Sequence, residues 1–447
     1  MDNLLINRRR VSVGLGAVLA SALLVRPGLA DTVLDASEFG LVAGSQADQT
    51  VALQAALDAA VQQGKSLALP AGEFHVREVR LPGAMRISGV PGASYLIGSG
   101  DAPIARVGAV SNLMLEGIAF VGNLGGGEET GLLVLDGSYG ISIRNCHFKG
   151  QATGIAAFGA MATIEACLFA EMGDAAIHSL DSNGLQIRGN RISVCGNAGV
   201  RIWRSASGLD GSIVTGNQIS SIDWVGGGNG QNGNGVNVFQ ADGVIVSDNV
   251  FADCSFTAVR VNAGRNTQVR GNTCLNSGEV AIFSEFGFSG SIIADNIIDG
   301  AATGIDITNL DSGGYLASCT GNIVRNIFPR SAVNPDTRPV GIYAEADTVV
   351  ANNVVENVPG VGIAAGYGPF VRNVLVTDNV LTGTDIGIGV TVVNDPQRGA
   401  VRVSGNLIAA PRHHPIAGME WESVVSTDLS RDAGNYPGVT VTDNTVS

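Results

Sequence analysis

Four charged side chains occupy similar places in successive copies of one short apolar segment. They are Arg260 in "AVRVNA", Glu285 in "AIFSEF", Asp306 in "GIDITN" and Glu345 in "GIYAEA". Two carboxyl groups in one site can act as general acid and general base, and an arginine beside them binds an anionic group or lowers a neighbouring pKa. These residues are therefore the candidate catalytic groups, provided that the fold brings them together.

The spacing of the carboxyl groups can be calculated for stacked strands. With repeats about 4.8 Å apart, the Cα atoms of Glu285 and Asp306 lie about 8 Å apart, and those of Glu285 and Glu345 about 10 Å apart. Such separations suit an inverting glycoside hydrolase better than a retaining one. A lyase or epimerase that uses Arg260 or His178 beside a carboxylate, with calcium neutralising a uronate, fits the same residues.

Aromatic and polar residues share the outward positions with these charged groups. Val and Ile alternate inward along each segment, so their neighbours point out of the same sheet. The expected substrate-binding residues on this face are His178, Arg201, Trp203, Asn237, Phe239, Phe283 and Tyr343. A row of exposed aromatics typically marks an interaction surface, and sugar rings stack on such rings. Beyond Tyr343 and Glu345 the positions hold Ala, Gly or Thr, so we expect the face to be bare there.

Three long insertions accompany the same segments, at residues 223–234, 309–318 and 329–340. Loops beside a rigid sheet commonly wall a binding groove. We expect a groove of about five coils, or roughly 20 to 25 Å, which would hold four or five sugar units. Each charged residue taken singly also fits an ordinary solvated surface.

The repeat that positions these residues is aligned on asparagine. In "VIVSDNVF" an Asn interrupts apolar residues, and related segments recur every 23 to 38 residues. The aligned residues are Asn190, Asn217, Asn249, Asn272, Asn296, Asn322, Asn353, Asn379, Asn406 and Asn444, with weaker copies at Gly117, Asn145 and Ala166. Two or three short apolar segments per repeat leave no room for helices. The pattern predicts an all-β fold, a parallel β-helix of about thirteen coils with three parallel sheets.

The asparagines themselves are expected to be structural. At a bend between strands, each side chain can donate to the carbonyl of its counterpart one coil away, which satisfies a buried amide. The 62 glycines among 447 residues agree with several tight corners in each coil. Candidate functional residues are therefore sought on the outward strand rather than at the corner.

Residues 1–30 have the pattern of an export signal. Arg8, Arg9 and Arg10 precede an apolar stretch of about fifteen residues that ends in small residues at Ala30. The arginines resemble a twin-arginine signal, although the Phe-Leu that usually follows the pair is missing, so the general secretory route stays open. We expect a periplasmic or secreted protein, delivered by the export machinery, without a membrane span in the mature chain.

Residues 31–98 resemble the entry segment of the pectate-lyase-like β-helix superfamily. The resemblance lies in a short strand, a polar loop, a helix predicted over residues 48–63 and the strand "LALPAGEFHV". With the repeats of residues 99–447 and the signal, the chain resembles twin-arginine-exported right-handed β-helix repeat proteins. The resemblance implies that the helix closes the first coil and that a polysaccharide binds the sheet and loops described above. The chain has no Gly-His-Gly triplet and no Asp-Asp pair, unlike polygalacturonase-type hydrolases.

Charge and cysteine content exclude some alternatives. Without residues 1–30 the chain has 22 basic and 39 acidic residues, which argues against a nucleic-acid partner. The six cysteines lack zinc-site spacing, so no metal cofactor is expected apart from calcium. Cys146 and Cys167, each one residue after an aligned position, either form a disulfide or remain small apolar residues. A polysaccharide-active enzyme, a non-catalytic glycan-binding protein and a structural cell-envelope protein all remain open.

Overall fold

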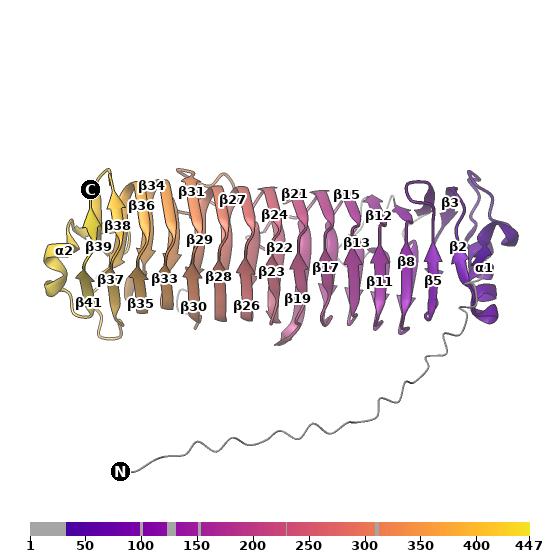
Figure 1. Ribbon diagram of the computed structural model, residues 1–447, viewed down its shortest axis with the longest axis horizontal. Coiled ribbons are helices and arrows are strands. Elements are labelled where there is room, and N and C mark those ends of the chain that lie inside the picture. The colour runs from indigo at the N-terminus through magenta and orange to yellow at the C-terminus, as the bar shows by residue number, and fades with distance from the viewer. Residues whose placement is uncertain (1–32, 99–101, 123–130, 151–152, 229, 309–312) are drawn as a thin grey trace, which may run out of the picture. The chain divides into compact units, whose positions relative to one another are not determined.

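The computed structural model describes residues 33–98, 102–122, 131–150, 153–228, 230–308 and 313–447. The predicted signal peptide lies outside these residues, as does the first part of the 309–318 insertion. Residues 33–447 form one compact unit of short strands that stack coil on coil (Figure 1). The predicted parallel β-helix is therefore confirmed.

Each coil contributes strands to three columns, here named A, B and C. Column A contains β1 (Val33–Asp35), β2 (Ser66–Ala68), β5 (Met85–Ser88), β8 (Leu113–Glu116), β11 (Ile141–Arg144), β14 (Ala162–Glu165), β17 (Gln186–Arg188), β20 (Ile213–Thr215), β23 (Ile245–Ser247), β26 (Arg265–Arg270), β28 (Ser289–Ala294), β30 (Tyr315–Thr320), β33 (Ala346–Ala351), β35 (Arg372–Thr377), β37 (Val401–Ser404) and β41 (Val439–Thr442). Column B contains β3 (Gly72–Val76), β6 (Ser94–Gly98), β9 (Ala119–Val121), β12 (His147–Gly150), β15 (Leu168–Met172), β18 (Arg191–Cys195), β21 (Gln218–Ile222), β24 (Val250–Cys254), β31 (Ile323–Ile327), β38 (Leu407–Ala409) and β42 (Thr445–Val446). Column C contains β4 (Val79–Arg80), β7 (Ala105–Gly108), β10 (Gly131–Asp136), β13 (Thr153–Phe158), β16 (Ala175–Leu180), β19 (Ala198–Leu209), β22 (Asn234–Asp242), β25 (Val259–Asn262), β32 (Val340–Ala344) and β39 (His414–Glu420).

Four long strands run from column B into column C without a break. They are β27 (Thr273–Glu285), β29 (Ile297–Thr308), β34 (Val354–Ala365) and β36 (Val380–Thr391). Hydrogen bonding consequently joins columns B and C into one sheet of 26 strands, whereas column A is a separate sheet of 16. The three predicted sheets are thus three columns in two hydrogen-bonded sheets. Among the named strand pairs, only β39 with β40 (Ser423–Ser426) is antiparallel.

The asparagine corner between columns A and B is a continuous amide ladder. From Asn190 to Asn444, each Nδ2 donates to the Oδ1 of the next asparagine at 2.8 to 3.0 Å. The same Oδ1 also accepts the backbone N–H of the previous asparagine, as from Asn190 to Asn217 at 2.9 Å. Each buried amide is thereby satisfied, and the predicted ladder is confirmed.

The ladder position of the earlier coils differs from the prediction by one residue. The Cys167 N–H donates to Asn190 Oδ1 at 2.9 Å, so Cys167, and Cys146 one coil before it, occupy this position. Both are free thiols. The three residues predicted as weak copies instead stand one place earlier at positive φ, and they are Gly117, Asn145 and Ala166. Later coils place Gly, Asp or Asn there, because these residues adopt the left-handed conformation most easily.

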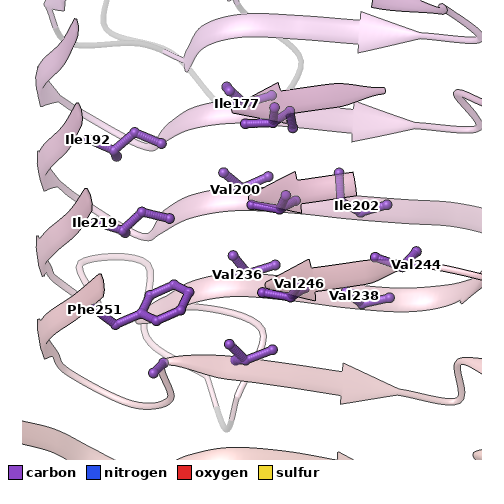
Figure 2. Close-up of a cluster of buried hydrophobic side chains, with 14 of the residues drawn as sticks. Ile177, Ile192, Val200, Ile202, Ile219, Val236, Val238, Val244, Val246 and Phe251 are labelled. Carbon is purple, nitrogen blue, oxygen red and sulfur yellow. The ribbon is translucent and has the colours of Figure 1, made fainter. Parts of the chain in front are cut away.

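The interior of the coils is filled by apolar columns. Ile192, Ile219 and Phe251 point inward at one level after another of column B, as Figure 2 shows. In earlier coils Phe120, Phe148 and Phe169 take the same column, and their rings stack in parallel at 5.0 and 4.8 Å. Burial of such a side chain contributes roughly 1.5 to 3 kcal/mol, and the repeat supplies one in every coil.

The predicted N-terminal helix is α1 (Thr50–Gln63). Asp48 Oδ1 accepts the Thr50 N–H at 2.8 Å at its start, and Gly64 ends it in the left-handed conformation. It buries Leu53, Ala56, Leu57 and Ala60 in the common core. Its role as a cap of the first coil stays a prediction. In the described part of the chain, no helix has the length and apolarity needed to cross a membrane.

Candidate functional site

The outward residues of column C are stacked in register, as the alternation predicted. One row consists of His178, Arg201, Asn237, Arg260, Phe283, Asp306 and Tyr343. A second row, two residues further along each strand, contains Trp203, Phe239, Asn262, Glu285 and Thr308. The structure therefore brings the candidate residues of these two rows onto one face.

The expected exposure of this face is wrong for several charged and polar residues. Six of the candidates have at most 7 % of their surface exposed, namely His178, Arg201, Asn237, Arg260, Glu285 and Glu345. They are buried because the insertions fold onto the face instead of standing beside it. Gly230 O accepts from Asn237 Nδ2 at 3.3 Å, and Asn334 Nδ2 donates to Glu279 Oε1 at 2.7 Å.

The two arginines of the first row have different carboxylate partners. Arg201 donates to both oxygens of Asp174, at 2.8 and 3.0 Å, and also to Asn232. Arg260 donates to both oxygens of Glu285, at 2.6 and 2.9 Å, and to Glu279 at 3.0 Å. Bidentate pairs of this kind fix the orientation of both side chains. Arg201, Arg260 and Glu285 consequently organise the face, and Glu285 has no oxygen without a hydrogen-bond donor.

His178 lies within a row of aromatic rings. Its ring meets Phe158 at 6.4 Å and Trp203 at 5.4 Å, and Trp203 meets Phe239 at 6.2 Å, all in edge-to-face geometry. Burial lowers the pKa of His178 to about 4, with a further contribution from the Arg201 charge, which the Asp174 charge opposes. The imidazole is therefore neutral at neutral pH and packs as an aromatic ring.

An aromatic cleft of about 570 Å³ opens at the C-terminal part of the face. Its lining includes Phe283, Asp306, Tyr343, Tyr367 and Trp421, together with the loop 334–340. The rings of Tyr343 and Tyr367 are 6.4 Å apart, and those of Tyr367 and Trp421 are 5.0 Å apart. Tyr367 and Trp421 thus extend the row of aromatics begun by Tyr343.

The positions that were expected to be bare belong to this cleft. Ala364 and Gly389 continue the row of Tyr343, and both line the cleft. Their small side chains leave the space that Tyr367 and Trp421 enclose. A change from large to small residues along one column therefore marks the cleft itself and not its end.

Asp306 is the unusual carboxyl group of the cleft. Its Oδ1 is buried and has no hydrogen-bond partner among the described residues. Burial raises the pKa of Asp306 well above its usual value, and the charges of Glu345, Glu285 and Glu279 raise it further. A raised pKa favours the protonated form of the carboxyl group, which can donate its proton.

Tyr343 and Glu345 lie next to Asp306. The Tyr343 hydroxyl donates to Glu345 Oε1 at 3.4 Å. Burial raises the pKa of Tyr343 well above its usual value, helped by the charges of Glu345 and Asp306. Glu345 has only 1 % of its surface exposed, so it acts on the cleft through its charge.

A second pocket of about 300 Å³ lies further toward the N-terminus on the same face. Trp203, Asn237, Phe239, Arg260 and Glu285 line it, with Gly230, Gln231, Asn262 and Phe286. The Arg260 guanidinium stacks over the Phe283 ring at 4.8 Å, between this pocket and the aromatic cleft. The face therefore carries two hollows, where the sequence predicted one groove.

Several residues of the site were missed from the sequence. Glu279, Arg338, Tyr367 and Trp421 line the cleft. Glu279 stands within β27, whereas Arg338, Tyr367 and Trp421 stand in loop segments that do not follow the repeat. The aromatic residues in the irregular segments "AGYGPF" and "MEWES" were the available signal. In the part of the chain that the structure describes, no group of three or more His, Cys, Asp or Glu side chains is arranged to hold a metal ion. Calcium stays an untested expectation.

Comparison with known families and structures agrees with this geometry. The family model described as the right-handed beta helix region matches residues 130–230 and 209–408, which is more than half of the chain. The chain belongs to the right-handed β-helix family. No curated protein matches it in sequence.

Three solved structures illustrate what the β-helix resembles. A PL6 alginate lyase in complex with a trisaccharide is 12 % identical, with a TM-score of 0.51, covering 93 % of this chain and 96 % of that chain. The catalytic unit of a GH87 α-1,3-glucanase from Streptomyces thermodiastaticus is 15 % identical, with a TM-score of 0.51, covering 88 % and 69 %. Tailspike protein 2 of bacteriophage CBA120 is 13 % identical over 71 % of this chain, with a TM-score of 0.49, and the match spans only 47 % of that domain. The similarity to the lyase and the glucanase shows a shared fold and nothing more.

Proposed function

We propose that this β-helix binds an extended polysaccharide in the aromatic cleft and cleaves a glycosidic bond, with Asp306 as the general acid. The observation that carries the proposal is the buried, unpartnered Asp306 oxygen at the cleft. Its raised pKa favours the protonated carboxyl group that a general acid needs. Protonation of the leaving oxygen is the step that such a group accelerates, typically about 100- to 10,000-fold.

The cleft walls support a sugar ligand. Tyr343, Tyr367 and Trp421 come from three different segments and present rings in T-shaped pairs. Pyranose rings have apolar faces that stack on such surfaces, while their hydroxyl groups need scattered polar partners such as Asn334 and Thr337. The fold shared with an α-1,3-glucanase and an alginate lyase agrees with a glycan ligand.

The neighbouring acid has a supporting role in this mechanism. Positive charge develops at the anomeric carbon as the glycosidic bond breaks. Glu345 makes the largest contribution of any neighbouring charge to the raised pKa of Asp306. A carboxylate that close would also stabilise positive charge in the transition state. The negative electric potential that raises the pKa of Asp306 is the same potential that favours a positive charge nearby.

A non-catalytic glycan-binding protein is the second candidate. Both oxygens of Glu285 and both of Glu279 accept hydrogen bonds, and Glu345 is almost fully buried. Asp306 is therefore the one acid of this group with an oxygen that lacks a partner among the described residues. Binding without cleavage would follow if no second group activates water.

The Asp306→Asn variant separates the two candidates. We expect a loss of at least about 100-fold in the release of reducing ends, with polysaccharide affinity retained, because the amide keeps the shape and lacks the acidic proton. The wild-type rate should also fall as the pH rises through the raised pKa of Asp306. Asp336→Asn, which changes an exposed acid on the same cleft, is the matched control and should keep most of the activity.

Two results decide the outcome of that comparison. Equal rates for Asp306→Asn and the wild type would overturn the assignment of the general acid. Binding by the wild type without release of any product would leave the non-catalytic candidate. Trp421→Ala should weaken binding about tenfold in either case, because the cleft loses one aromatic wall.

We also propose that the protein is exported through residues 1–30. The arginines and the apolar stretch of the sequence support this step. Replacement of Arg8, Arg9 and Arg10 by lysine should retain the chain in the cytoplasm if the twin-arginine route is used, whereas the general secretory route tolerates lysine. Fractionation of cells that express both forms distinguishes the two routes.

A further inference from the structure

We infer that the aromatic cleft selects a neutral polysaccharide and rejects uronates, so that its reaction is hydrolysis and not elimination. The inference rests on the proposed function and adds the substrate class. It starts from the charges that surround the cleft. Four carboxyl groups line it, and they belong to Glu279, Asp306, Asp336 and Glu422, whereas Arg338 is the one basic residue of the described lining.

The guanidinium of Arg338 is already engaged. It forms an ion pair with Glu422, donates to the Tyr367 hydroxyl at 2.8 Å and lies 4.7 Å from the centre of that ring. A uronate carboxylate at Arg338 would share this one positive charge with Glu422. Arg338 therefore shapes the cleft wall and leaves the local charge negative.

Arg260, the next cation along the face, is also engaged. Its guanidinium lies between Glu285 and Glu279 and carries one positive charge against their two negative charges. This group of three is negative as a whole and is at most 8 % exposed at the arginine side chain. Among the described residues, no basic side chain at the cleft remains without a carboxylate partner.

An acidic sugar would meet like charges in this cleft. At separations of about 5 to 6 Å in a partly buried site, each added carboxylate is disfavoured by at least about tenfold in affinity. The excess of acidic residues in the whole chain also repels polyanions at longer range. Neutral pyranose rings have no such penalty and keep the stacking on Tyr343, Tyr367 and Trp421.

The substrate class also decides the chemistry. Elimination removes the C5 proton, which is acidic enough only beside a uronate carboxyl whose charge is neutralised, and the cleft supplies no spare cation for that purpose. In hydrolysis, Asp306 gives its proton to the leaving oxygen and the bond from this oxygen to the anomeric carbon breaks. A water molecule then adds its hydroxyl group to that carbon, and its remaining proton restores the Asp306 carboxyl group.

The test compares polymers that differ only in charge. Binding is measured for a panel of neutral glucans of different linkage and for the same glucans after oxidation of their primary hydroxyls to carboxylates. Polygalacturonate and alginate are added as natural uronates, and every polymer is tested with and without calcium. We expect at least one neutral glucan to bind at least tenfold more tightly than its oxidised form. Its products should carry new reducing ends and no unsaturated sugar.

A charge variant makes the test specific to the cleft. Glu422→Gln removes one carboxylate and releases Arg338, so the difference between neutral and oxidised glucans should shrink severalfold. Glu356→Gln changes an exposed acid of column B and should leave the difference as it is. Melting temperatures of both variants confirm that they are folded.

Three outcomes would overturn the inference. The first is tighter binding of the oxidised polymers or uronates than of every neutral glucan, and the second is release of unsaturated sugars. Both leave the proposed polysaccharide function intact. The third is absence of binding to any polymer of the panel, which overturns the proposed function together with the inference.

Discussion

The asparagine corner and the outward face of column C are built from the same coils, yet they follow opposite rules. At the corner one residue type repeats from Asn190 to Asn444, and each copy makes the same bonds to the next. On column C almost every coil has a different residue. Its partners include carboxylates of neighbouring coils, such as Asp174 and Glu279, and insertion residues that occur once, such as Asn232 and Asn334. A column in which the same residue type repeats therefore has a structural role. A column in which the residue type changes from coil to coil contains the candidate functional site.

The comparison also shows two ways to bury polar groups. The corner satisfies its amides through neighbours of the same kind, so that nothing outside the repeat is needed. Column C satisfies Arg201 and Arg260 through carboxylates such as Asp174 and Glu279 but, among the described residues, leaves Asp306 Oδ1 without a hydrogen-bond partner. A buried polar group without a partner is costly, which is why such groups concentrate at functional sites.

The largest expected effect comes from breaking the ladder in its middle. Asn272 Nδ2 donates to Asn296 Oδ1 and to Val246 O at 3.0 Å, and Asn272 Oδ1 accepts two bonds from Asn249 at 3.0 Å. Asn272→Ala removes these four bonds and a fifth, from Asn272 Nδ2 to Arg270 O at 3.1 Å, and leaves buried groups unsatisfied in the adjacent coils. We expect the free energy of unfolding to fall by about 4 kcal/mol, measured by urea denaturation.

Asn183→Ala is the control for this measurement. Asn183 is exposed, and its side chain is outside the ladder. Its loss should change the free energy of unfolding by less than about 0.5 kcal/mol. Equal effects of the two variants would mean that the ladder adds nothing to stability.

The second effect concerns acid stability and column C. Burial holds the pKa of His178 at about 4, below its ordinary value of 6.5. Because the unfolded chain binds this proton more readily, stability should fall as the pH decreases from about 6.5 to about 4, by up to about 3 kcal/mol in total.

The variant His178→Phe tests that assignment. It keeps an aromatic ring between Phe158 and Trp203 and removes the proton-binding group. Urea denaturation at several pH values should show a flatter dependence between pH 6.5 and 4 than in the wild type. Parallel curves for the two proteins would place the acid sensitivity elsewhere.

The smallest expected effect extends the ladder by one coil. The Cys167 sulfur lies 3.3 Å from Glu165 O and 3.6 Å from Ile143 O, the carbonyls that an asparagine amide would use there. Cys167→Asn should add a bond to Asn190 Oδ1 and stabilise the protein by about 1 kcal/mol. In Cys195→Asn, which buries an amide away from the ladder, stability should fall. A loss of stability in Cys167→Asn would show that the ladder cannot continue toward the N-terminus.

The sequence predicted the part of the site that the repeat controls. Alternation of inward Val and Ile placed Phe283, Asp306 and Tyr343 in one row, and the structure has them in that register. The sequence did not predict that Arg260 and Glu285 bind each other and become buried. Nor did it reveal Glu279, which reaches Asn334 across 55 residues of sequence.

What the sequence determined by itself is the coil, its corner and the direction of each side chain. These depend on short patterns in which the requirement of one coil is met by the same residue in the next, so every copy carries the whole rule. The tertiary structure alone decided which outward residues are buried, how the face is divided into two hollows, and that Asp306 Oδ1 finds no hydrogen-bond partner in the described part of the chain. Those properties depend on single contacts between segments far apart in the sequence and on the exclusion of water. A local sequence pattern predicts neither the contacts nor the exclusion of water.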